Sequence, residues 1–345
     1  MGRQPRCHQQ DSGGGLTRLP TLNELSDRLT RPTTAEIETL ARHPGDIIVL
    51  GASGKMGPSL IGRLRRADPD RVIYAVSRRP IATSAIAIEA DLHNPDEVAD
   101  LPYAPNVFYL VGRKFGSTGR PEVTWATNTI VPSLIGHHYR DSKIVAFSSG
   151  NVYPLVSVNS TGSVESDTPR PLGEYAQSVL ARERIFEYYA RENSTPTIIL
   201  RLNYAIDLRY GTLVDIARRV WTGQPLPIRV PQVNAIWQGD ANSYAIQSLD
   251  LCAWPAKILN ISGPEIVHVV GAGQWFAQRF NKPLTLERGT PGMQALLNNA
   301  SLCHQLLGPP EVDLATLQEW VAQWIEQGGE LLDKPTHFEA TDGNF

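Results

Sequence analysis

The segment GASGKMG carries glycines at positions 51, 54 and 57, directly after the apolar stretch DIIVL. Glycines in this pattern permit a tight turn, a close approach of the backbone to a pyrophosphate, and close contact between the preceding strand and the next helix. The start of that helix offers free N–H groups and a partial positive charge to phosphates. The segment therefore predicts a dinucleotide-binding turn, although glycines also occur in ordinary turns.

Polar residues after the next two apolar stretches bear on the choice of dinucleotide. Ser77, Arg78 and Arg79 stand where an NAD-selective site usually carries an acidic residue. A hydroxyl and two cations suit a 2′-phosphate, so we expect an NAD(P) site that favours NADP. The alternative is that both arginines are solvated surface charges. Asp91 either accepts a hydrogen bond from the adenine amino group or caps the next helix.

The elements that must position these residues alternate short apolar stretches, rich in β-branched residues, with helical patterns. Such alternation is typical of βαβ units, and right-handed crossovers place helices on both faces of the sheet. We therefore expect an α/β fold, a Rossmann-type doubly wound parallel sheet with a smaller C-terminal substrate lobe and a ligand crevice at the carboxyl ends of the strands. The predicted strands are 46–50, 71–76, 85–90, 106–111, 143–148, 197–202 and 257–262.

The remaining segments suggest the domain organisation. Residues 1–20 are polar and glycine-rich, so we expect them to be disordered. Two capping-box patterns, one starting at Thr21 and one at Thr33, predict a helical prelude over 21–45. The other expected parts are a dinucleotide-binding domain over 46–205, to which 235–263 returns, and a substrate lobe over 206–234 and 264–330. We expect a surface tail over 331–345, whose His337 and Asp342 could reach a site or a partner subunit.

The composition excludes several classes of partner. The chain has 345 residues, 41% apolar and 19% charged, and its net charge of -3 comes from well-mixed acids and bases. This pattern argues against a nucleic-acid partner and a membrane surface, and no apolar run approaches the ~20 residues of a membrane span. The start of the chain lacks the apolar middle of a secretion signal. We therefore expect a cytoplasmic protein with a small-molecule substrate. The three cysteines are too few and too scattered for a disulfide framework or a metal site.

Several ordered motifs make residues 46 to about 327 resemble an extended short-chain dehydrogenase/reductase of the NAD-dependent epimerase/dehydratase kind. They are VLGASGKMG, ADL, TWATNTIVPSLI, AFSSGNVYP, EYAQSVLARERIFE and IWQGDANSYAIQSL. The resemblance implies an NAD(P)-dependent oxidoreductase or epimerase that acts by hydride transfer on a sugar, a sugar derivative or a nucleotide sugar.

By this resemblance, Ser149 matches the hydroxyl that binds the reacting oxygen of the substrate, and Tyr175 matches the general acid/base. Reduction of a carbonyl develops negative charge on its oxygen, which needs a nearby hydrogen-bond donor and a proton source. A serine at the end of a central strand and a tyrosine on the next helix can meet there. Otherwise Ser149 is a turn residue and Tyr175 a half-buried helix aromatic.

The family's lysine, four residues after the tyrosine on the same helix face, is Val179 in this chain. That lysine holds the cofactor ribose and lowers the pKa of the tyrosine, and Val179 brings no charge. Our first candidate for a relocated cation is Lys114, and Arg182 is an electrostatic aid; His137 and His138 fit the exposed end of the preceding helix better. Activity without such a cation, and a redox sensor or scaffold that binds the dinucleotide without turnover, remain open.

The resemblance also bears on the type of reaction, on the assembly and on further residues of the site. Gly150 and Asn151 stand where sugar-nucleotide 4,6-dehydratases carry Asp and Glu, which argues against dehydration by that route. The helices over 124–139 and 174–190 form a dimer interface in relatives, so we expect a homodimer, although their apolar faces could equally pack inward. The expected substrate contacts are Asn128, Asn203 and Arg209, and the expected cofactor contacts are Gly51, Ser53, Gly54, Lys55, Met56, Gly57, Ser77, Arg78, Arg79, Asp91, Leu92, Val111, Gly112 and Tyr175.

Overall fold

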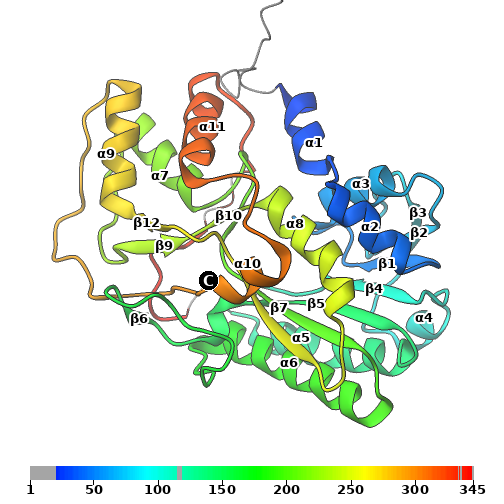
Figure 1. Ribbon diagram of the computed structural model, residues 1–345. Coiled ribbons are helices and arrows are strands. Elements are labelled where there is room, and N and C mark those ends of the chain that lie inside the picture. Colours follow the sequence, from blue (N-terminus) through cyan, green and yellow to red (C-terminus); the bar gives the residue numbers. More distant parts are fainter. Residues whose placement is uncertain (1–20, 115–118, 333, 335, 344–345) are drawn as a thin grey trace, which may run out of the picture.

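The computed structural model describes residues 21–114, 119–332, 334 and 336–343, and the segment expected to be disordered lies outside them. Its centre is a seven-stranded parallel sheet (Figure 1). From edge to edge the strands are β11 (Lys257–Ile261), β7 (Thr197–Leu202), β5 (Lys143–Ser149), β4 (Asn106–Tyr109), β1 (Ile47–Leu50), β2 (Ile73–Ser77) and β3 (Ile86–Glu89). Every predicted strand is present, with its ends shifted by at most two residues.

Helices cover both faces of this sheet, which confirms the predicted doubly wound fold. Two apolar clusters sit between the sheet and its helices, one on each face. Figure 1 shows α5 and α6 below the sheet and α2, α3 and α8 on the opposite face. The helices of the sheet domain, including the short α4, have these bounds: α2 (Thr34–Arg42), α3 (Gly57–Ala67), α4 (Pro95–Ala99), α5 (Pro121–His138), α6 (Gly173–Asn193) and α8 (Gln238–Gln247).

A smaller lobe packs around its own apolar cluster and stands at the upper left of Figure 1. Its helices are α7 (Thr212–Trp221), α9 (Val269–Phe280) and α11 (Leu314–Glu326), and its antiparallel pair is β9 (Gln232–Asn234) with β12 (Ile266–His268). The connections between lobe and sheet carry β6 (Val156–Ser157) with β13 (Gln294–Ala295), β8 (Ala205–Ile206) with β10 (Ile236–Trp237), α10 (Ser301–Leu307) and the 3-10 turn η1 (Gly150–Val152). A second 3-10 turn, η2 (Ser248–Leu251), lies in the sheet domain between α8 and β11.

The last described segment is not the surface tail that we expected. Phe338 is 2% exposed and belongs to the apolar cluster of the lobe. Thr336 donates hydrogen bonds from its backbone N–H and its hydroxyl to the Asp215 carboxylate, at 2.9 and 2.5 Å. An apolar anchor and a half-buried acceptor therefore hold this polar segment against α7.

The helical prelude starts with the two predicted capping boxes, at Thr21 and Thr33. Its first helix, α1 (Leu22–Thr30), places Leu25 and Leu29 in the apolar cluster of the lobe. Its second helix, α2, packs on the sheet domain. The prelude therefore joins both parts of the molecule.

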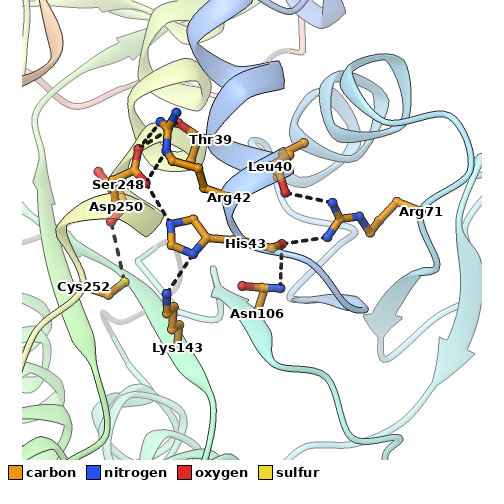
Figure 2. Close-up of polar contacts among 10 residues, drawn as sticks. All are labelled: Thr39, Leu40, Arg42, His43, Arg71, Asn106, Lys143, Ser248, Asp250 and Cys252. Atoms are coloured by element: carbon orange, nitrogen blue, oxygen red, sulfur yellow. Dashed lines mark hydrogen bonds and ion pairs between the residues drawn. The ribbon is translucent and has the colours of Figure 1, made fainter.

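At the end of α2, His43 lies between opposite charges (Figure 2). Its Nε2 is 2.9 Å from Asp250 Oδ1, and its Nδ1 is 2.7 Å from the Lys143 ammonium nitrogen. An ammonium group can only donate, so Nδ1 accepts and the ring is neutral in this arrangement. Burial lowers the pKa of His43 from its ordinary value of 6.5, and the Lys143 charge acts in the same direction although Asp250 opposes both.

We expect the chain to lose stability as the pH falls below 6.5, because protonation of His43 costs more in the folded protein than in the unfolded one. Thermal denaturation between pH 7.5 and 5.5 measures this, and His43→Gln should flatten the dependence. The raised pKa of buried Asp240 works in the opposite direction, so the informative quantity is the difference between the two proteins. Equal pH dependence in both would contradict the assignment.

Candidate active site

The turn after β1 leaves no room for side chains at two of its glycines. Gly51 has a φ of +86°, and a Cβ there would lie 3.0 Å from Leu110 C and Val111 N. A Cβ at Gly57 would lie 2.2 Å from the carbonyl oxygen of Ala52, which lets α3 start directly against the turn. This cradle of bare backbone at a helix N-terminus fits a pyrophosphate.

A cleft of about 410 Å³ extends from this turn along the carboxyl ends of the strands. Many of the predicted cofactor contacts line it, from the turn, the ends of β2 and β3, and the segment after β4. They are Gly51, Ser53, Gly54, Ser77, Arg78, Asp91, Leu92, Val111 and Gly112. The cleft therefore has a phosphate cradle in its floor and polar groups at its outer end, which fits a dinucleotide. Gly57 and Arg79 do not line the cleft, and Lys55, Met56 and Tyr175 line a neighbouring cavity.

The outer end of the cleft carries Arg78 and Asp91. The Asp91 carboxylate already takes part in hydrogen bonds with His93. Ser77 donates its hydroxyl hydrogen bond to the carbonyl oxygen of Arg79 at 2.6 Å, so this hydroxyl is already engaged. Asp91 does not cap the next helix, because Asn94 does. A hydrogen bond from His93 lowers the pKa of Asp91, and the charge of Arg78 adds to this effect.

Sequence reasoning missed three polar residues that line this cleft, His93, Arg113 and Thr127. The His93 ring contacts Asp91 through Nδ1 at 2.9 Å and Thr127 through Nε2 at 3.2 Å. The spacing of His93 from Asp91 in ADLH was the available signal.

The structure brings the three predicted catalytic residues, Ser149, Tyr175 and Lys114, to one cavity of about 250 Å³. Ser149 ends β5, and its Oγ accepts a hydrogen bond from the Asn151 N–H at 3.2 Å. Tyr175 lies in the first turn of α6, and Lys114 Nζ is 6.0 Å from the centre of its ring. Burial lowers the pKa of Lys114 to about 8. The cavity adjoins the cofactor cleft, because the lining passes from one to the other between Gly54 and Lys55 and between Arg113 and Lys114.

Two residues of the glycine turn, expected at the cofactor, line this second cavity instead: Lys55 and Met56. The Lys55 ammonium donates to the carbonyl oxygen of Ala205 at 2.5 Å and lies 4.1 Å from the centre of the Tyr210 ring. Burial lowers the pKa of Lys55 to about 7, with Asp207 acting in the opposite direction. The cavity therefore holds two lysines, and no acidic side chain is among its described lining residues.

Val179, at the position of the family's lysine, is fully buried and packs with Val152, Tyr153 and Tyr175. Arg182, one turn further along α6, donates a hydrogen bond from Nη1 to the Val111 carbonyl oxygen at 2.7 Å. It therefore braces the wall of the cofactor cleft. His138 donates a hydrogen bond from Nε2–H to the Leu101 carbonyl oxygen at 3.2 Å. Neither His137 nor His138 lines the cavity.

The structure places only one of the three predicted substrate contacts at the cavity. Asn128 is fully buried, donates to Ser178 Oγ at 2.9 Å and accepts from the Arg113 N–H at 3.4 Å. It lines neither cavity and instead ties α5 to α6 and to the loop after β4. Arg209 pairs with Asp207 through Nη2 at 2.5 Å and lies outside the cavity. Both expectations are corrected. Asn203 does line the cavity and donates to Asn234 Oδ1 at 3.0 Å.

A buried ion pair next to the site was not foreseen. Arg201 on β7 binds both carboxylate oxygens of Glu183 on α6, at 3.0 and 2.7 Å, and donates to the Tyr153 hydroxyl at 2.7 Å. Ser148 also donates to Glu183. Because these residues come from β5, β7, α6 and the segment after η1, the network fixes the backbone that carries Ser149.

Gly150 lies where the surrounding side chains leave little room for a larger residue. A Cβ at this position would lie 2.7 Å from the Asn298 side-chain nitrogen, so the present packing leaves no space for the acidic residue of a 4,6-dehydratase. Within the described part of the chain, no group of three His, Cys, Asp or Glu side chains could hold a metal ion.

Residues 47–206 match the model of the NAD dependent epimerase/dehydratase family. The match covers slightly less than half of the chain, including the glycine turn, Ser149 and Tyr175. The family match and the shared fold confirm the predicted resemblance and an NAD-dependent enzyme of this type. A comparison with curated proteins finds no match.

Solved structures share the fold of this chain at low sequence identity. MoeE5 in complex with UDP-glucuronic acid and NAD is 21% identical, with a TM-score of 0.68 over 82% of this chain and 100% of that chain. UDP-glucose 4-epimerase from Thermotoga maritima with UDP-glucose is 15% identical, with a TM-score of 0.70 over 82% and 99%. An epimerase from Methanothermobacter thermautotrophicus is 16% identical, with a TM-score of 0.71 over 86% and 97%. Among the described residues, no helix has the length and apolar character needed to cross a membrane.

Proposed function

We propose that the protein is an NAD(P)-dependent oxidoreductase or epimerase that acts by hydride transfer on a hydroxyl or carbonyl group of a sugar, a sugar derivative or a nucleotide sugar. The observation that carries this proposal is the position of Ser149, Tyr175 and Lys114 around one cavity that adjoins the dinucleotide cleft. Similar structures bind UDP-glucuronic acid, UDP-glucose and NAD, which supports a nucleotide sugar as the substrate class.

In this mechanism the chain holds the reacting oxygen and moves its proton. A nicotinamide, when bound, supplies or accepts the hydride. Ser149 donates a hydrogen bond to the substrate oxygen, and Tyr175 takes the hydroxyl proton in oxidation and returns it in reduction. The Lys114 ammonium stabilises the deprotonated form of Tyr175, which is the role that Val179 cannot fill. Arg182 and Asn128 hold the loop after β4, from which Lys114 projects.

A substrate screen tests this function. Purified protein is incubated with NAD or NADP and a panel of nucleotide sugars and free sugars, and nicotinamide absorbance is followed together with NMR of the products. Net oxidation accumulates reduced cofactor, whereas epimerisation changes the sugar without net redox change. The competing proposal is a redox sensor or scaffold that binds the dinucleotide without turnover, and Val179 is the observation that favours it. Bound cofactor that no panel member reduces or oxidises would support this second function.

Lys114→Ala should lower the turnover of the best substrate from this panel by tenfold or more, because the cavity then loses a buried cation near the Tyr175 ring. Dinucleotide binding should change little, since Lys114 lies outside the cofactor cleft. Lys257→Ala, at an exposed site on β11, is the control. Turnover at the parent rate in Lys114→Ala would exclude the relocated lysine.

We also propose that NADP is the preferred dinucleotide, on the strength of Arg78 at the outer end of the cleft. Arg78→Ala should weaken NADP binding by roughly 10-fold, because a charge-assisted hydrogen bond to the 2′-phosphate is lost, and should leave NAD binding nearly unchanged. Titration calorimetry measures both affinities. Arg79→Ala is the matched control, since Arg79 does not line the cleft. Equal losses for NAD and NADP would refute the preference.

A homodimer through α5 and α6 is a further part of the proposal. Ile130 and Tyr188 are 51% and 56% exposed on these two neighbouring helices, and a second copy of the same face would cover them. Light scattering of the purified chain tests this assembly, and a monomeric mass at micromolar concentration would rule it out.

A further inference from the structure

Lys55 occupies an unusual place for a residue of the glycine turn. Its side chain leaves the cofactor cleft and enters the cavity that holds Ser149 and Tyr175. There it spans to β8, where it donates to the Ala205 carbonyl oxygen, and lies over the Tyr210 ring. A carbonyl and a ring face stabilise an ammonium group but do not neutralise it.

The acidic side chains near Lys55 do not neutralise the charge of its ammonium group. Asp207 is the acid with the largest electrostatic effect on Lys55, but both of its oxygens accept hydrogen bonds from Arg209, at 2.5 to 3.2 Å. Asp215, the second acid, accepts from Thr336. Lys114 and Arg209 act on Lys55 as like charges. Among the described residues no carboxylate forms an ion pair with Lys55, so the cavity carries excess positive charge.

A second, independent feature lies at the wall of the same cavity. Thr212 lines it, is fully buried, and its hydroxyl has no hydrogen-bond partner in the part of the chain that the structure describes. A buried hydroxyl without a partner costs free energy unless a ligand supplies one. Thr212 also begins α7, whose N-cap Gly211 provides no side-chain hydrogen bond, so the helix start adds partial positive charge.

We propose that Lys55 and Thr212 form a subsite for a carboxylate on the sugar part of the substrate, beside the carbon that reacts. This inference rests on the proposed function, which makes the cavity the place of hydride transfer. The carboxylate accepts hydrogen bonds from the Lys55 ammonium and the Thr212 hydroxyl, and it compensates the buried charge that the free protein carries. The substrate class is therefore a uronic acid or its nucleotide derivative.

The pH dependence of binding follows from the same groups. Burial holds the pKa of Lys55 to about 7 in the free protein, so the amine loses its charge as the pH rises through neutrality. A bound carboxylate favours the protonated amine. Binding at pH 8 should therefore take up a proton, and the preference for the anionic ligand should decrease between pH 6.5 and 8.5.

Titration calorimetry with matched probes tests the subsite. The protein is first saturated with NAD or NADP and then titrated with UDP-glucuronate, UDP-glucose or UDP. The two sugar nucleotides differ only in a carboxylate against a hydroxymethyl group. We expect UDP-glucuronate to bind at least about tenfold more tightly than UDP-glucose, as charge-assisted hydrogen bonds predict. Lys55→Met should remove most of this preference while leaving the affinity for UDP-glucose and UDP unchanged.

A second variant keeps the test decisive if Lys55→Met folds poorly. Thr212→Val preserves shape, removes the unpartnered hydroxyl, and should reduce the preference by roughly three- to tenfold. Lys257→Met, at an exposed position on β11, should retain the full preference.

The outcomes separate this inference from the proposed function. Equal affinity for UDP-glucuronate and UDP-glucose, or binding of neither to the dinucleotide-loaded protein, overturns the subsite. Lower affinity for UDP itself in Lys55→Met also overturns it, because Lys55 would then bind the diphosphate. Failure to bind NAD or NADP in the first step contradicts the proposed function itself.

Discussion

Tyr175→Phe is expected to lower kcat by about 10²- to 10⁴-fold, the usual contribution of a positioned general acid/base. The change removes only the phenolic hydroxyl of a residue that lines the cavity with Ser149, so the ring can remain in its apolar cluster with Val179. Initial rates with the best substrate of the screen measure the effect. Dinucleotide affinity and the thermal denaturation midpoint should stay close to those of the parent.

Tyr188→Phe is the matched control for this experiment. Tyr188 lies on the same helix but is 56% exposed, and its loss of a hydroxyl should leave kcat unchanged. If Tyr175→Phe retained the parent kcat, Tyr175 would not be the acid/base, and the cavity would need another proton carrier.

Glu36→Gln is expected to lower the free energy of unfolding by about 3–5 kcal/mol, the typical loss when one partner of a buried ion pair is removed. Arg63 binds both oxygens of Glu36, at 2.5 and 2.9 Å, and the two side chains are 2% and 0% exposed. The variant leaves the Arg63 charge buried without its counterion and loosens α2 from α3. Urea denaturation of the full chain measures the change.

An exposed pair between the prelude and α3 serves as the control. Asp27 and Arg66 are 2.7 Å apart with side chains about 40% exposed, so Asp27→Asn should cost about 1 kcal/mol or less. The double variant Glu36→Leu, Arg63→Met should recover part of the loss, since it buries no charge. Similar small losses in Glu36→Gln and Asp27→Asn would mean that the buried pair does not anchor the prelude.

The sheet could be predicted from the sequence because its signals are local. Stretches such as DIIVL and TIILRL are too short and too β-branched for helices, and they become strands buried on both faces, β1 and β7. The glycine turn was equally readable, since Gly51 and Gly57 stand where the backbone itself excludes a side chain.

The direction in which side chains point could not be predicted in the same way. Lys55 belongs to the glycine turn by sequence, yet its long side chain reaches across to β8 and enters the second cavity. Asn128 lies in a motif of the family but uses its amide to join α5 and α6. These outcomes depend on contacts between residues far apart in the chain, which no local pattern encodes.

The buried network around Arg201 and the anchoring of Phe338 have the same origin. Arg201 reads as part of an apolar strand, and its partner Glu183 lies on a different element. Phe338 sits in a polar segment that looked like a surface tail. Its ring is buried only because the folded lobe offers an apolar cluster in which it packs.

The central claim is that a dinucleotide in the cleft after β1 brings its nicotinamide to the cavity of Ser149 and Tyr175. A crystal structure of the chain with NADP and UDP-glucuronate tests it most directly. We predict the pyrophosphate on the turn at Gly51, the nicotinamide at the junction of the two cavities, and both hydroxyls within about 3 Å of one substrate oxygen. Density for the dinucleotide elsewhere, or a substrate oxygen that contacts neither hydroxyl, would contradict the account.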